Sequence, residues 1–115
     1  MMEEGKKFDG GKLRYDLLPF DSLDELVKVY THGAEKYEDR NWETGIRYSR
    51  ILAAMLRHVT AWAMGERNDP DTGLHHLAHA AWGCFAIIAY QRRSMIAFDD
   101  MKQGENGGHT VLKSD

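Results

Sequence analysis

The fold is decided by the stretch LHHLAHAAWGCFAIIA, residues 74–89, which contains no proline, acid, lysine or arginine. Its apolar side chains recur every three or four residues, the spacing of one helical face. The stretch predicts a helix that ends near the polar residues 91–93. Because it is the most apolar part of the chain, we expect this helix to be central. The repeating residues are Leu74, Leu77, Ala78, Ala81, Trp82, Phe85, Ile88 and Ala89.

Two earlier segments show the same helical periodicity. The first begins at Ser22, which forms a capping-box pattern with Glu25, and extends to about residue 38. The second begins near residue 48 and ends at Gly65. After the third helix, the stretch SMIAFDDMK either extends that helix or forms a short fourth one. The sequence therefore predicts an all-α fold of three long helices.

The length of 115 residues fits a single domain that spans the whole chain. We expect residues 1–20 to form an irregular N-terminal arm, with Leu17 and Leu18 docked on the body. Residues 21–98 should form the helical core and residues 104–115 a flexible tail. Three helices with broad apolar faces often complete their bundle core by dimerisation, so we predict a homodimer or higher homo-oligomer.

Composition and charge exclude several classes of function. A hydrophobic content of 43% is too high for intrinsic disorder. The net charge of -3 and pI near 6.0 disfavour binding to a nucleic-acid polymer. The N-terminus lacks the apolar core of a signal peptide, and no uncharged stretch approaches membrane-spanning length. Cys84, within an apolar run, predicts a buried thiol. These features favour a cytoplasmic protein.

Glu35 and Glu38 are the first candidate metal ligands. They stand three residues apart on the first predicted helix, so both project from one face and can share a hard cation. Counted from Leu23, they fall beside the apolar stripe, at the contact between helices, where carboxylates require a compensating cation. A glutamate pair next to Lys28 and Lys36 is also typical of a solvated surface, and this alternative stays open.

Histidines gather at the start of the third predicted helix. His75, His76 and His79 offer pairs at three- and four-residue spacing, and imidazoles so placed can share a metal. Histidines near a helix start also hydrogen-bond loop carbonyls without any metal. His58, at the edge of the apolar stripe of the second helix, is equally compatible with a core position.

Three carboxylates, Glu66, Asp69 and Asp71, lie in the turn that leads into these histidines. Turns favour Asp for capping reasons alone. Because this turn runs directly into the histidines, its carboxylates can complete the same site, and Asp71 is the preferred candidate.

In the arm, Lys12 and Arg14 follow a glycine pair that allows close backbone approach to phosphate oxygens. The P-loop spacing is absent. A lone Gly-Gly-Lys is also typical of a flexible turn.

Four strings occur in one order and spacing that resembles the phage-type dATP/dGTP diphosphohydrolase family: KFDGGKLRYDLLP, GAEKYEDRNW, LRHVTAW and GERNDPDTGLHHLAHAAW. The likeness covers roughly residues 7–88. That family is similar to MazG-like all-α nucleoside triphosphate pyrophosphohydrolases, whose paired acidic helix motifs, Glu-x-x-Glu and Glu-x-x-Asp, bind magnesium or manganese. Residues 35–38 match the first motif. The second falls on residues 76–79, where both carboxylates are replaced by histidines.

The resemblance implies metal-dependent hydrolysis of purine deoxynucleoside triphosphates to the monophosphate and pyrophosphate, in phage nucleotide metabolism and the host cytoplasm. The expected cofactor is Mg²⁺ or Mn²⁺; because imidazole ligands shift the preference, Co²⁺ and Zn²⁺ are alternatives. The predicted metal ligands are Glu35, Glu38, Asp71, His76 and His79, with Asp69 as an alternative. The predicted catalytic residues are Glu35, Glu38 and His58. The predicted substrate-binding residues are Lys12, Arg14, Lys36, Asn41 and Trp42.

Two other interpretations remain. An HD-type phosphohydrolase would suit a chain with several histidines on helices, but it needs an adjacent His-Asp pair, which this sequence lacks. A non-enzymatic helical interaction module, whose histidines bind a structural metal or nothing, would fold without turning over any triphosphate.

Overall fold

The computed structural model describes residues 2–101, and the regular structure within this range is helical. The three α-helices are α1 (Phe20–Lys36), α2 (Tyr48–Ala63) and α3 (His76–Arg92). Three 3-10 turns accompany them, at Tyr15–Leu17, Asn41–Thr44 and Ile96–Phe98. No strand forms among these residues, so the predicted all-α fold is confirmed.

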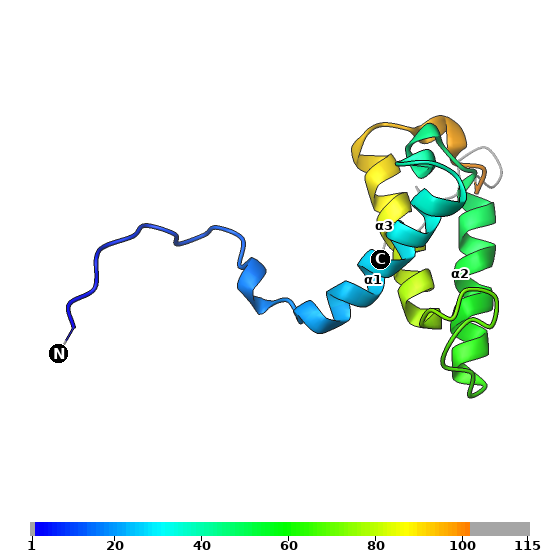
Figure 1. Cartoon of the computed structure of the whole chain (residues 1–115). Helices are drawn as coiled ribbons and strands as arrows, with labels where there is room; N and C mark the ends of the chain where they lie inside the picture. The colour runs from blue at the N-terminus through cyan, green and yellow to red at the C-terminus, as the bar shows by residue number, and fades with distance from the viewer. Residues whose placement is uncertain (1, 102–115) are drawn as a thin grey trace.

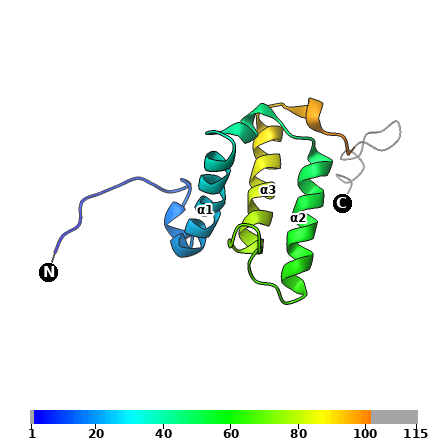
Figure 2. The same cartoon turned by 45° about the vertical axis from the view of Figure 1, so that its right-hand side comes forward.

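The three helices lie side by side in one layer, with α3 in the middle (Figure 1, Figure 2). α3 packs against both neighbours, and more extensively against α2 than against α1. Gly83 permits the close approach of α2, because a Cβ at this position would lie 2.3 Å from Met55 Cγ and 3.2 Å from Ile51 Cγ2. The central position predicted for the most apolar helix is therefore confirmed.

The core lies at the end of the layer where α2 begins and α3 ends. Tyr48 and Ile51 from α2 pack there against Ala86 and Tyr90 from α3. The rings of Tyr48 and Tyr90 stack with centroids 6.0 Å apart, and the Tyr90 hydroxyl donates to the carbonyl of Trp42 at 2.5 Å. This bond fixes the turn between α1 and α2, because Tyr90 is fully buried.

The ends of α1 differ from the prediction at both termini. The helix begins at Phe20 behind Pro19, and the Ser22 backbone N–H is bound by Asp21 Oδ1 at 2.7 Å. It ends at Lys36, because Tyr37 adopts φ -114° and ψ -86°, outside the helical region. Residue 38 therefore lies beyond the helix.

The segment after α3 forms only a 3-10 turn, so the expected short fourth helix reduces to Ile96–Phe98. Asp100, which follows this turn, accepts hydrogen bonds from the backbone N–H of Ser49 at 2.9 Å and from its hydroxyl at 2.5 Å. The end of the described chain thus caps the start of α2. The predicted tail, residues 104–115, lies outside the described residues.

Two expectations about burial are wrong for the single chain. Leu17 and Leu18 do not dock on the body: they are 70% and 46% exposed, because the arm runs away from the three helices (Figure 1). Cys84 is exposed, because a single layer of helices leaves one side of α3 uncovered. Phe85 and Ile88 are about half exposed on that side.

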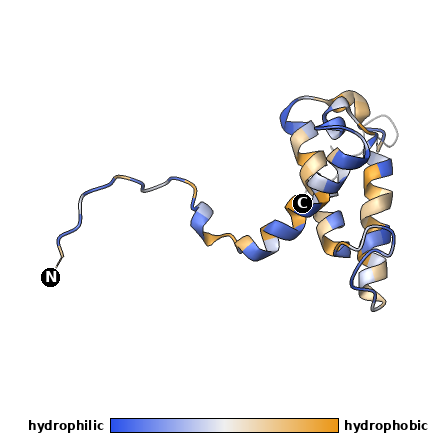
Figure 3. Cartoon of the chain, viewed as in Figure 1, coloured by the Kyte–Doolittle hydropathy of each residue, from blue (hydrophilic) through white to orange (hydrophobic). Residues whose placement is uncertain are grey.

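The ribbon of α2 is likewise apolar along much of its length (Figure 3). Its exposed apolar side chains include Leu56, Val59 and Trp62. Within residues 2–101, however, no helix is both long and apolar enough to cross a membrane.

Candidate functional site

The loop between α2 and α3, residues 64–75, is closed on itself by backbone hydrogen bonds. His76 N–H donates to the Arg67 carbonyl at 2.9 Å, and Asp69 N–H donates to the Leu74 carbonyl at 2.8 Å. Gly73 adopts φ +74°, a left-handed conformation that glycine accepts without strain. The closed loop holds its side chains in place against the two helices that it connects.

The loop carboxylate of Asp69 is fixed by its own backbone surroundings. Asp69 Oδ1 accepts a hydrogen bond from the Asp71 backbone N–H at 2.7 Å. Its other oxygen, Oδ2, lies 3.6 Å from His58 Nδ1 on α2. Asp69 therefore points inward, whereas Asp71 is exposed and contributes its backbone to this arrangement.

Three potential metal ligands converge at this place. One ligand atom each from His58, Asp69 and His76 lies within 4.8 Å of the other two. The two histidines face each other with Nδ1 atoms 2.9 Å apart. On the far side of its ring, His76 Nε2 lies 2.7 Å from Glu66 Oε1. The cluster thus joins α2, the loop and the first residue of α3.

His79, one turn further along α3, extends the cluster. Its ring stacks on that of His58, with centroids 4.5 Å apart and an interplanar angle of 8°. Its Nε2 atom lies 2.8 Å from Thr72 Oγ1. His75 takes no part, because its Nδ1 accepts a hydrogen bond from Leu77 N–H and caps α3.

The electrostatics of the cluster favour neutral imidazoles at His58 and His79 beside an ionised Asp69 carboxylate. Burial lowers the pKa of His58, and the neighbouring Asp69 only partly offsets this effect. Burial also lowers the pKa of His79, and His58 adds to the shift. Although burial alone would raise the pKa of Asp69, the Asp71 N–H and the two histidines lower it. Unprotonated nitrogen and ionised oxygen are the forms that bind metals.

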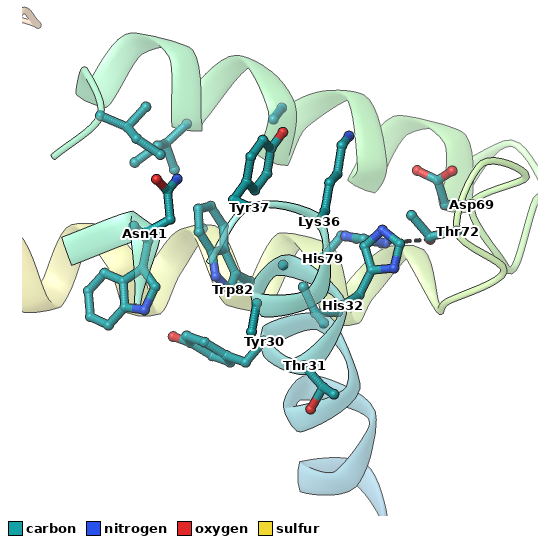
Figure 4. Close-up of a pocket in the computed structure, with 18 of the residues that line it drawn as sticks. Tyr30, Thr31, His32, Lys36, Tyr37, Asn41, Asp69, Thr72, His79 and Trp82 are labelled. Carbon is teal, nitrogen blue, oxygen red and sulfur yellow. Dashed lines mark hydrogen bonds between the residues drawn. The ribbon is translucent and has the colours of Figure 1, made fainter. Parts of the chain in front are cut away.

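A cavity of about 990 Å³ adjoins the cluster and is lined by all three helices. Figure 4 shows Asp69, Thr72 and His79 at one end, Asn41 at the other, and Lys36 between them. The basic residues that line it are Lys36, Arg40, Arg50 and Arg57; the acidic ones are Glu38, Asp39, Asp69 and Asp71. A cavity of this size accommodates a nucleotide.

The predicted glutamate pair is not arranged as expected. Glu35 and Glu38 are both exposed and not at a helix contact, and they share no helical face, because α1 ends at Lys36. Glu38 lines the large cavity, but Glu35 lines a separate, shallower pocket with His32 and Leu74. The group of clustered metal-ligand side chains found within residues 2–101 contains neither glutamate.

The other predicted site residues fall into two groups: those at the cavity or the cluster, and those in the exposed arm. Lys36, Asn41, Trp42, Asp71 and His79 line the cavity, and His58 and His76 belong to the cluster. Lys12 and Arg14 lie in the exposed arm outside the cavity, and the Arg14 guanidinium pairs with Asp16 at 2.8 Å.

Neither the basic residues of α2 nor the contact between Glu66 and His76 was singled out from the sequence. Arg50, Ala54 and Arg57 line the cavity. Their spacing of four and then three residues places them on one face of a helix, so the sequence could have indicated that Arg50 and Arg57 lie on the same side of α2. The sequence indicated that the loop carboxylates, Glu66 among them, could join the histidines. It did not indicate which carboxylate would contact His76, because that depends on how the loop closes.

Comparison with known proteins covers most of the chain. Residues 2–100 match the family model described as dATP/dGTP diphosphohydrolase, N-terminal. A relative named dATP/dGTP diphosphohydrolase, from Salmonella phage PMBT28, is 40% identical over 84 residues, which are 73% of this chain. The matched region spans only 29% of the relative's length. No solved structure gives a significant match. The resemblance seen in the sequence strings is thereby confirmed, and the chain belongs to the dATP/dGTP diphosphohydrolase N-terminal family.

Proposed function

We propose that this chain binds a divalent metal ion between His58, Asp69 and His76, and hydrolyses dATP or dGTP in the adjoining cavity to the monophosphate and pyrophosphate. The observation that carries the proposal is the position of this cluster at one end of a nucleotide-sized cavity with basic residues in its walls. The name of the phage relative, dATP/dGTP diphosphohydrolase, supports the choice of substrate.

The three side chains fit a divalent ion. Two imidazole nitrogens that bind one divalent ion, each at about 2.1 Å, would lie roughly 3–3.4 Å apart. His58 Nδ1 and His76 Nδ1 are separated by 2.9 Å. Two nitrogens and one carboxylate suit Mn²⁺, Co²⁺ or Zn²⁺ better than Mg²⁺. Of the five metal ligands predicted from sequence, this proposal keeps only His76. It takes Asp69, the predicted alternative, in place of Asp71, and adds His58. It leaves out Glu35, Glu38 and His79.

A divalent ion in this place would supply Lewis-acid polarisation of a phosphate oxygen and of the attacking water. The chain's own residues supply the rest. Lys36, Arg50 and Arg57 line the cavity and can orient the triphosphate. Asn41, at the other end, and Trp42, which also lines the cavity, can contact the base.

In the proposed reaction, the water oxygen bonds to the α-phosphorus while the bond from this phosphorus to the α,β-bridging oxygen breaks. Pyrophosphate leaves with that oxygen, and Glu38, whose carboxylate lines the cavity, accepts the water's proton. The sequence also made His58 a candidate general base. We do not assign it this role, because its Nδ1 faces the metal position.

A panel assay tests this function. The chelator-treated chain is incubated with each of the four deoxynucleoside triphosphates and with Mg²⁺, Mn²⁺, Co²⁺ or Zn²⁺, and chromatography resolves pyrophosphate from phosphate and triphosphate. We expect pyrophosphate and a purine monophosphate, with Mn²⁺ or Co²⁺ more effective than Mg²⁺.

Asp69→Asn should lower turnover by at least about tenfold, because it removes the charged ligand. Asp24→Asn is the matched control, since Asp24 is exposed on α1 and lines neither pocket. Nucleotide and metal binding without turnover would contradict hydrolysis by this region.

A further inference from the structure

Glu66 contacts the buried histidine of the cluster from the side opposite the metal position. His76 is only 4% exposed, and its Nε2 atom lies 2.7 Å from Glu66 Oε1. The Glu66 side chain is itself 51% exposed at the rim of the loop. Because the His76 ring is buried, its Nε2 needs a hydrogen-bond partner, and Glu66 provides one from the rim of the loop.

The contact determines which nitrogen of His76 carries a proton. An ionised carboxylate only accepts hydrogen bonds, so His76 Nε2 must be the donor to Glu66. Neutral His76 then has an unprotonated Nδ1, and this atom faces the Nδ1 of His58 at 2.9 Å. Without a metal, His58 must therefore donate from its own Nδ1, with Asp69 Oδ2 3.6 Å away on the same side.

We propose that Glu66 is a positioning residue that holds His76 in the Nε2–H tautomer and presents its Nδ1 lone pair to the metal position. This inference rests on the metal site of the proposed function. Glu66 gives the His58–His76 hydrogen bond a fixed direction. Without Glu66, either ring can donate to the other, and His76 Nδ1 is available only part of the time.

The proposal also defines what metal binding requires of His58. His76 already presents an unprotonated Nδ1, so its proton stays on Nε2 beside Glu66. His58 must carry its proton on Nε2 before its Nδ1 can bind a metal. His76 therefore already has the tautomer that metal binding requires, whereas His58 must change its tautomer.

The first test measures tautomers in the metal-free chain by ¹⁵N nuclear magnetic resonance of the histidine rings. We expect His76 to be a single Nε2–H tautomer in the wild type and a mixture of tautomers in Glu66→Ala. Glu66→Gln keeps the size of the side chain but can donate as well as accept, so it should also lose the preference. Glu66→Asp should retain it in part.

The second test measures Co²⁺ affinity by calorimetry. Glu66→Ala should weaken binding by roughly 10–100-fold, and Glu66→Asp should restore part of the loss. Glu25→Ala is the matched control, because Glu25 pairs with Lys28 on the surface of α1 at 2.8 Å. Circular dichroism confirms that each variant is folded.

The outcomes separate the two proposals. A single Nε2–H tautomer of His76 and unchanged Co²⁺ affinity in Glu66→Ala would overturn the role of Glu66 while leaving the metal site intact. A wild-type chain that binds none of the four metals would overturn the metal site. In that case the tautomer measurement still decides whether Glu66 orients His76.

Discussion

His58 and His76 face each other through Nδ1 atoms 2.9 Å apart, although 18 positions separate them and they belong to different helices. His58 comes from the last half of α2, and His76 is the first residue of α3. The loop between them adds Asp69 to the same cluster. The cluster therefore depends on how α2 and α3 are aligned along their lengths.

The metal-free protein should lose stability as the pH falls below about 6.5, the ordinary pKa of histidine. Burial lowers the pKa of His58 and His79 in the folded chain. Between the lowered and the ordinary values, the unfolded chain binds more protons, so stability is full above this window and decreases as the pH falls through it. Thermal unfolding in chelator, from about pH 8 to pH 5, measures the effect.

His79→Gln should reduce this pH dependence, because it removes one of the two groups that titrate. Thr60→Ala is a control on α2 outside the cavity, and its pH dependence should equal that of the wild type. A wild-type midpoint that did not change across this pH range would show that the buried histidines do not carry the predicted linkage.

Arg57→Ala should weaken nucleotide binding. Arg57 lines the cavity immediately before the cluster residue His58, where a basic group can bind phosphate oxygens. Loss of a charge-assisted hydrogen bond corresponds to roughly a tenfold or greater increase in Kd. Titration with dATP in the presence of Mn²⁺ measures this change.

Arg67→Ala is the matched control, because Arg67 is exposed on the loop and does not line the cavity. Equal weakening by the two substitutions would indicate a general effect of charge rather than a phosphate contact at Arg57.

Gly83→Ala should destabilise the chain through the contact between α2 and α3. The added Cβ would lie 2.3 Å from Met55 Cγ and 3.2 Å from Ile51 Cγ2, so it would crowd two side chains of α2. Overpacking costs about 1–3 kcal/mol, which exceeds the gain of about 1 kcal/mol from replacing glycine within a helix. Thermal or urea unfolding measures the net loss.

Met55→Ala in the Gly83→Ala background should recover part of that loss, because it removes the clashing atoms. Each substitution alone should destabilise, so a double-mutant cycle reveals the coupling. Additive effects would mean that the two side chains do not compete for the same space.

We expect two copies of the chain to associate through the uncovered side of α3. A helix that is apolar all round is normally covered, and a domain normally has at least two layers. Phe85 and Ile88 are 52% and 53% exposed on this side. Sedimentation velocity should show a dimer for the wild type and a monomer for Phe85→Asp.

Ile96→Asp serves as the control for this experiment. Ile96 is 64% exposed but lies in the 3-10 turn after α3, outside the uncovered helix face. The Ile96→Asp variant should still sediment as a dimer. A wild-type chain that sediments as a monomer at micromolar concentrations would contradict the prediction.

The helices could be predicted from sequence because their signal is local. Apolar residues at helical spacing located α2 and α3 and indicated that α3 is central. The end of α1 was less predictable, since the backbone turns at Tyr37 although the side-chain pattern continues there. The docking of Leu17 and Leu18 and the burial of Cys84 were wrong, because burial depends on what covers a residue and not on its own type.

The sequence alone was enough to predict the all-α fold, the family and the histidines at the start of α3, because each depends on residues close together in the chain or on matching strings. Only the tertiary structure brought together His58, Asp69 and His76, and separated Glu35 from the cavity. The physical reason is that spacing along one helix fixes which residues share its face. The partners of that face depend on where Gly83 lets α2 approach and on how the loop closes.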